Sequence, residues 1–102
     1  MAAQLLVMYN QPEDPQAFES YYYGTHVPIF AETPGVRAVV FSRGPVTNIV
    51  GNANVYLVAQ VTFDSMSDLE AGLASEAAQA ALADFPNFAT AGVSIMAFET
   101  RE

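Results

Sequence analysis

The order in which apolar and helical segments follow one another limits the fold of this chain more than any other feature. Short apolar runs rich in β-branched and aromatic residues, typical of strands, cover residues 4–9, 36–42, 55–63 and 93–100. Helical patterns separate the first run from the second and the third from the fourth. A long hairpin connection at residues 43–54 joins the middle two. The predicted order is therefore β-α-β-β-α-β.

This order is the split βαβ pattern of ferredoxin-like α+β domains. Right-handed crossovers place both helices on one face of a four-stranded antiparallel sheet. The chain has 102 residues, which suits one domain of this kind, so we expect residues 1–102 to form a single unit.

The first helix has a clear start and an irregular end. Asp14 is a favourable N-cap residue, and Pro15 suits the first helical position. Pro28 should break or restart the helix, because proline has no N–H to donate and crowds the preceding turn. Spacings of three and four residues predict a buried face formed by Phe18, Tyr22, Thr25 and Ile29.

The second helix has two competing starts. Ser67 and Glu70 form a capping box, and Ser65 with Asp68 offers the same motif two residues earlier. One amphipathic helix is predicted to continue from here to Pro86. Its buried positions would be Met66, Leu69, Leu73, Ala77 and Ala80.

Both faces of the predicted sheet are apolar. The first strand has Leu5, Val7 and Tyr9 on one side and Leu6 and Met8 on the other. Two helices can cover only one face, and monomers rarely expose apolar patches above roughly a few hundred Å². We therefore expect a homodimer joined through the sheet face that the helices leave open.

Composition excludes several classes of function. The net charge is −8, with 11 acidic residues and no lysine, so neither nucleic acid nor an anionic membrane surface is an expected partner. The absence of cysteine excludes thiolate and iron–sulfur chemistry, and a single histidine excludes a two-histidine metal centre in one chain. Without lysine there is no Schiff base, and no phosphate-binding glycine loop is present. We expect no cofactor and no metal.

Two stretches of the chain resemble the EthD family, a branch of the dimeric α+β barrel superfamily. Residues 18–28 follow the pattern Phe-x-x-Tyr-Tyr-x-x-x-His-x-Pro, and Pro-Gly follows at 34–35. Phe-Asp-Ser at 63–65 and Asp-x-x-Asn-Phe at 84–88 complete the resemblance, which extends over residues 4–100. It implies the ferredoxin-like fold and the dimer. The family is named after a gene of ethyl tert-butyl ether degradation, and the wider superfamily includes isomerases, dehydratases, cofactor-free monooxygenases and haem degraders.

His26 is the first candidate for catalysis, because an imidazole has an ordinary pKa close to neutral pH. It follows Thr25, about 100° round the helix, and so should lie at the edge of the buried face. Alternatively, His26 donates a hydrogen bond to a backbone carbonyl where Pro28 interrupts the helix. Tyr22 is the second catalytic candidate, because a phenol near His26 could polarise a substrate carbonyl.

Other aromatic and charged residues allow two interpretations each. Phe18, Tyr21 and Tyr23 are candidates for substrate binding or for aromatic core. Asp84 is interpreted as a structural residue that ties the end of the second helix. Arg37 and Arg43 could bind a substrate carboxylate or phenolate, although pairing with surface acids is favoured.

These residues predict a small, cofactor-independent enzyme with a pocket between the inner sheet face and the first helix. Its substrate would be a small apolar, aromatic or polyketide-like carbonyl compound, converted by acid–base chemistry such as isomerisation or dehydration, or oxygenated as the resemblance implies. Two alternatives stay open: a non-catalytic binding or accessory protein of a degradation pathway, and haem binding with His26 as axial ligand. The N-terminus lacks a basic n-region, which favours a cytoplasmic protein.

Overall fold

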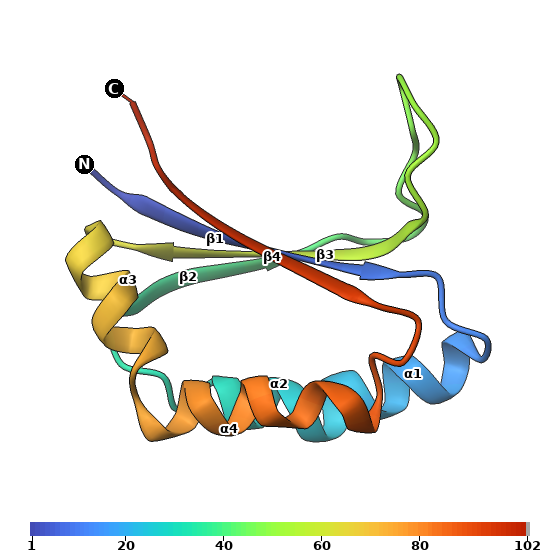
Figure 1. Cartoon of the computed structure of the whole chain (residues 1–102), viewed down its shortest axis with the longest axis horizontal. Helices are drawn as coiled ribbons and strands as arrows, with labels where there is room; N and C mark the ends of the chain where they lie inside the picture. Colours follow the sequence, from blue (N-terminus) through green and yellow to red (C-terminus); the bar gives the residue numbers. More distant parts are fainter. Residues whose placement is uncertain (102) are drawn as a thin grey trace.

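Four strands form one antiparallel sheet in the order β2-β3-β1-β4. The computed structural model describes residues 1–101. The strands are β1 (Ala3–Asn10), β2 (Val36–Phe41), β3 (Val55–Phe63) and β4 (Val93–Glu99). All helices lie on one face of this sheet, as Figure 1 shows. The predicted ferredoxin-like α+β fold is therefore confirmed. No helix among residues 1–101 has the length and apolar character needed to cross a membrane.

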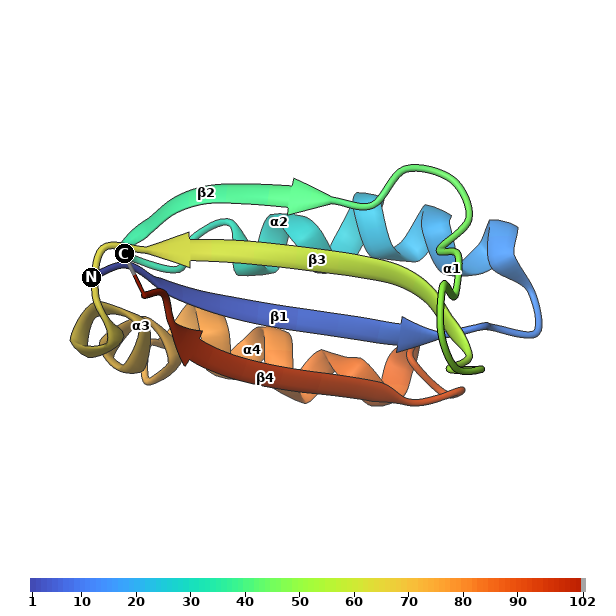
Figure 2. The same ribbon diagram turned by 90° about the horizontal axis from the view of Figure 1, so that it is seen from above.

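The helices form two groups that run side by side beneath the sheet (Figure 2). The first group lies along the half of the sheet that contains β2 and β3. It consists of α1 (Pro15–Tyr21), the π-helix η1 (Tyr22–His26) and α2 (Val27–Phe30). In the second group α4 lies along β1 and β4, and α3 lies at the end of the sheet near the chain termini. This group consists of α3 (Met66–Leu73), α4 (Glu76–Asp84) and the 3₁₀-helix η2 (Phe85–Asn87).

Pro28 changes the type of the first helix without breaking it. Asp14 caps α1 as predicted, since its side chain accepts a hydrogen bond from the Ala17 N–H. Pro28 cannot donate to the carbonyl four residues back, and its ring would crowd that carbonyl. The helix widens just before it, so that the Val27 N–H bonds to the Tyr22 carbonyl five residues back. The predicted interruption therefore takes the form of a π-turn.

The π-turn decides which residue faces the sheet. A π-helical turn contains more residues than an α-helical turn. His26, four positions after Tyr22, therefore faces the sheet together with Tyr22, and Thr25, three positions after it, does not. His26 is accordingly buried, with 5% of its surface exposed, and Thr25 is exposed. The prediction that Thr25 belongs to the buried face and His26 to its edge is wrong.

The second helical segment is two helices, so the prediction of one continuous helix is also wrong. Ser65, and not Ser67, caps α3 through its hydroxyl. The chain then breaks at Ser75, whose hydroxyl donates to a carbonyl of α3 and accepts from an N–H of α4. This new start shifts the buried face of the second half by one residue, from Ala77 to Ala78.

The sheet has one covered and one open face. Every second residue of β1, and of β3 from Leu57 onward, is buried against the helices. On the opposite face apolar side chains remain partly exposed, up to 64% at Val40, and the strand register makes several of them neighbours. We call this set the open-face patch; it consists of Leu6, Met8, Val40, Met96 and Phe98.

Candidate functional site

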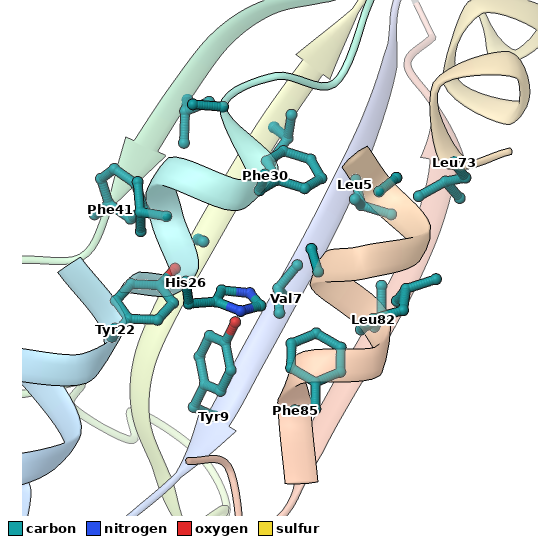
Figure 3. A pocket seen from close by; sticks show the side chains of 18 residues that line it. Leu5, Val7, Tyr9, Tyr22, His26, Phe30, Phe41, Leu73, Leu82 and Phe85 are labelled. Carbon is teal, nitrogen blue, oxygen red and sulfur yellow. The ribbon is translucent and has the colours of Figure 1, made fainter. Parts of the chain in front are cut away.

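A cavity of about 170 Å³ lies between the covered face of the sheet and the helices. Strands β1 and β3 form its floor, and α2 and α4 form its walls (Figure 3). Most of its lining is aliphatic or phenyl, including Leu5, Val7, Phe30, Leu82 and Phe85. Only three of the lining side chains carry polar atoms, and these are Tyr9, Tyr22 and His26. Such a cavity suits a small apolar molecule with one or two polar groups.

His26 projects from η1 across this floor toward α4. Its Nδ1 atom lies 3.0 Å from Oδ2 of Asp84, the last residue of α4, and both side chains are buried. The other carboxylate oxygen, Oδ1, accepts hydrogen bonds from the Tyr21 hydroxyl at 2.7 Å and from the Asn87 amide at 2.9 Å. Asp84 thus joins the end of α4 to both α1 and η1.

The environment of this pair sets its protonation. Burial lowers the pKa of His26, and the nearby Asp84 carboxylate opposes this shift without cancelling it. Burial would raise the pKa of Asp84, but hydrogen bonds from Asn87, Tyr21 and His26 outweigh burial and lower it. At neutral pH the aspartate is therefore ionised and the imidazole neutral. An ionised carboxylate can only accept, so Nδ1 carries the proton and Nε2 is left as a base.

Two tyrosines place hydroxyl groups beside this base. The Tyr22 ring stacks on the His26 ring, with centroids 5.7 Å apart, and the Tyr9 hydroxyl points toward His26 in Figure 3. Burial raises the pKa of both Tyr9 and Tyr22 well above the ordinary value. Both hydroxyls therefore stay protonated and can donate a hydrogen bond to a bound molecule. The cavity combines a base with two donors.

The five residues singled out from the sequence lie in different places. His26 and Tyr22 line the cavity. Phe18 is buried behind them and stacks on Tyr22, whereas Tyr21 reaches past the cavity to Asp84. Tyr23 is 43% exposed and lines a second hollow at the edge of the sheet. Phe18, Tyr21 and Tyr23 therefore lie outside the cavity wall.

Sequence reasoning missed Tyr9 and gave Asp84 too small a role. Asp84 does tie the end of α4, through Asn87, but it also holds His26. The signal was present: Asp84 continues a buried helical stripe of small residues, where an acid needs a partner. Tyr9 is the last inward residue of β1, and its place in an apolar strand predicts a core position but not a partner.

Metal ligands do not gather at this site. Within residues 1–101 no three His, Cys, Asp or Glu side chains converge. At the cavity His26 and Asp84 already bond to each other through their facing atoms.

The fold and the cavity define an α+β domain of the split βαβ class with an apolar cavity under its sheet. A family model described as the EthD domain matches residues 10–92. The chain therefore belongs to the EthD domain family, and the resemblance inferred from its motifs is confirmed. An uncharacterised 11.0 kDa protein of Rhodococcus erythropolis, from the thcB-thcC intergenic region, is 35% identical over 94 residues, covering 91% of this chain and 89% of that protein.

Solved structures agree with this assignment. An ethyl tert-butyl ether d (EthD) family protein from Bacillus halodurans C-125 is 30% identical, covers 99% of this chain and 100% of its own, and superposes with a TM-score of 0.86.

More distant structures share the fold alone. A hydroxynitrile lyase from Passiflora edulis is 12% identical with a TM-score of 0.76, covering 99% of this chain and 94% of its own. The cofactor-independent oxygenase SnoaB from Streptomyces nogalater is 16% identical with a TM-score of 0.67 and the same coverages. A dimeric ferredoxin-like protein of unknown function from Thermobifida fusca is 13% identical with a TM-score of 0.69, covering 98% and 92%.

Proposed function

We propose that the protein is a cofactor-independent acid–base enzyme that transfers a proton at the carbon next to the carbonyl of a small apolar compound. The observation that carries this proposal is the 3.0 Å bond between His26 Nδ1 and Asp84 Oδ2 at the wall of an otherwise apolar cavity. It leaves Nε2 as the base. A buried, oriented histidine that lines a cavity is the kind of group found at functional sites.

The proposed step assigns a role to each polar group. Nε2 of His26 removes a proton from the substrate carbon, and the electron pair moves onto the carbonyl oxygen to form an enolate. The hydroxyl of Tyr22 or Tyr9 donates a hydrogen bond to this oxygen as its negative charge develops. The ionised Asp84 stabilises the imidazolium that forms. Return of the proton to another carbon, or loss of a leaving group, gives isomerisation or elimination.

The distant structures support the chemistry as precedent only. The same fold occurs in a hydroxynitrile lyase and in a cofactor-independent oxygenase, so it accommodates more than one kind of enzyme, and one of these works without a cofactor. Acid–base transfer is favoured here over oxygenation because the cavity contains an oriented histidine base.

Proton exchange tests the proposal directly. We expect the protein to accelerate the exchange of the acidic C–H protons of 2-tetralone, a flat bicyclic ketone, for deuterium in D₂O, followed by proton NMR. The cavity favours such a compound because its walls are apolar and its donors are close to the base. Saturation-transfer NMR on the same sample reports binding. Binding without exchange would instead support the alternative, a non-catalytic binding or accessory protein.

We further propose that the protein is a homodimer joined through the open-face patch. Replacing Met96, 50% exposed on β4, with aspartate places a charge within that interface. Light scattering should give a dimer of the 10.9 kDa chain for wild type and a monomer or aggregate for Met96→Asp. Ala80→Asp, on the exposed side of α4, is the matched control and should stay dimeric. A wild-type monomer at micromolar concentration would contradict the dimer.

A further inference from the structure

A second hollow lies beside the cavity, at the edge of the sheet where β2 ends. It measures about 640 Å³ and is bounded by the start of the connection at residues 42–46, by the first helix and by β3. Phe41 lines both the hollow and the cavity. Its ring lies edge-on to Tyr22 on the cavity side, at 6.0 Å between centroids, and to Tyr23 on the hollow side, at 5.7 Å. The two spaces are therefore neighbours that share one aromatic wall.

The hollow is polar where the cavity is apolar. Gln11, Tyr23 and Tyr56 contribute an amide and two hydroxyls, and Glu19 and Arg43 contribute one charge of each sign. A molecule that extends from the cavity into the hollow would therefore need an apolar body and a polar end. The cavity alone predicts the apolar body of such a molecule but not its polar end.

Arg43 is the cation among the residues that line the hollow, and none of the ion pairs within residues 1–101 involves it. Arg37, in contrast, forms an ion pair with Asp64 at 2.7 Å, as the sequence favoured. The acid of the hollow, Glu19, already accepts a hydrogen bond from the Tyr56 hydroxyl. In a chain of net charge −8, this leaves a guanidinium with its donors available beside the candidate site.

We propose that the substrate carries a carboxylate, which Arg43 binds in the hollow while the carbonyl end lies at His26. This rests on the proposed function and adds to it the charge of the substrate. A guanidinium binds a carboxylate through two parallel hydrogen bonds, which fixes orientation as well as charge. The apolar body would pass along Phe41 into the cavity. Glu19 repels an anion, so the carboxylate must lie on the Arg43 side of the hollow.

A matched pair of ligands isolates the contribution of the charge. 2-Tetralone-6-carboxylate and 2-tetralone-6-carboxamide have nearly the same shape, but only the first is anionic. We expect wild type to bind the carboxylate about tenfold more tightly than the carboxamide, the size of one partly exposed charge-assisted contact. In Arg43→Gln the two dissociation constants should become about equal. Calorimetry or NMR titration measures both constants without depending on turnover.

The outcomes separate this inference from the proposed function. Equal binding of the two ligands by wild type, a preference that survives in Arg43→Gln, or failure of both to bind would overturn the role of Arg43, even if 2-tetralone is exchanged. A preference that disappears in Arg43→Gln supports that role, even if no ketone is exchanged and the proposed reaction fails. Thermal unfolding of Arg43→Gln should match wild type, because Arg43 is exposed and bonds to no acid.

Discussion

Replacing His26 with glutamine is expected to lower the rate of proton exchange by about 10²- to 10⁴-fold, the usual contribution of a positioned general base. Glutamine keeps a polar side chain of similar length that can still bond to Asp84, but it has no basic nitrogen. Ligand binding should therefore survive while exchange is lost. NMR measures both on one sample of each variant, with 2-tetralone as the probe.

Asp84→Asn tests how the base is oriented. An amide at this position can donate to Nδ1, which would move the imidazole proton to Nε2 and remove the base from the cavity side. Exchange should fall strongly although His26 is still present. Asp64→Asn is the matched control, because Asp64 pairs with Arg37 on the surface, away from the cavity. Full exchange in Asp84→Asn would show that Asp84 serves the fold alone.

The pH dependence of wild-type exchange follows from the protonation of His26. Only the neutral imidazole can accept a proton, so the rate should rise with pH and reach a plateau once His26 is deprotonated. Because burial lowers the pKa of His26, the midpoint should lie below the ordinary value of 6.5. Exchange should therefore be close to its plateau at pH 7. A midpoint above 6.5, read from exchange rates across the acid range, would contradict the assignment of His26 as a buried neutral base.

The order of strands and helices along the chain could be predicted because it depends on patterns that are local in the sequence. The apolar runs of the four strands and the cap at Asp14 are each decided within a few residues, whereas the choice between Ser65 and Ser67 as the cap of α3 stayed open. The sequence also placed the irregularity of the first helix correctly at Pro28. It could not show that the helix would accommodate the proline by widening, because a break and a π-turn both accommodate the hydrogen bond that proline cannot donate.

Only one member of the candidate pair could be predicted, because the contact between the two depends on how the helices pack. His26 stands out by residue type, but its burial depends on the π-turn, and its partner Asp84 is 58 residues away. The break at Ser75 sets the phase of α4, and η2 turns Asn87 back onto the carboxylate. Contacts of this kind exist only after α1, η1 and α4 have packed on the sheet. Propensity and spacing therefore identify the base but not the group that orients it.

The stability of this packing should depend most on Phe63, the last residue of β3, which is fully buried. Its ring lies against backbone at two glycines: a Cβ on Gly35 would lie 3.6 Å from it, and one on Gly72 only 2.9 Å. The ring thus fills space bounded largely by main chain. This main chain belongs to the turn before β2 and to the hydrogen-bonded helix α3, and it cannot collapse far into a void.

Phe63→Ala is therefore expected to lower the free energy of unfolding by about 3–5 kcal/mol, the usual cost of such a truncation in a core. This is a large share of the roughly 5–15 kcal/mol that holds a domain folded. Urea denaturation at one fixed protein concentration measures it, since dimerisation would make the midpoint depend on concentration. Val50→Ala, at a position 92% exposed in the connection between β2 and β3, is the control and should change stability by less than about 0.5 kcal/mol. A loss below about 1 kcal/mol for Phe63→Ala would mean that the region around Gly35 and Gly72 closes over the void, against the rigidity argued from its backbone contacts.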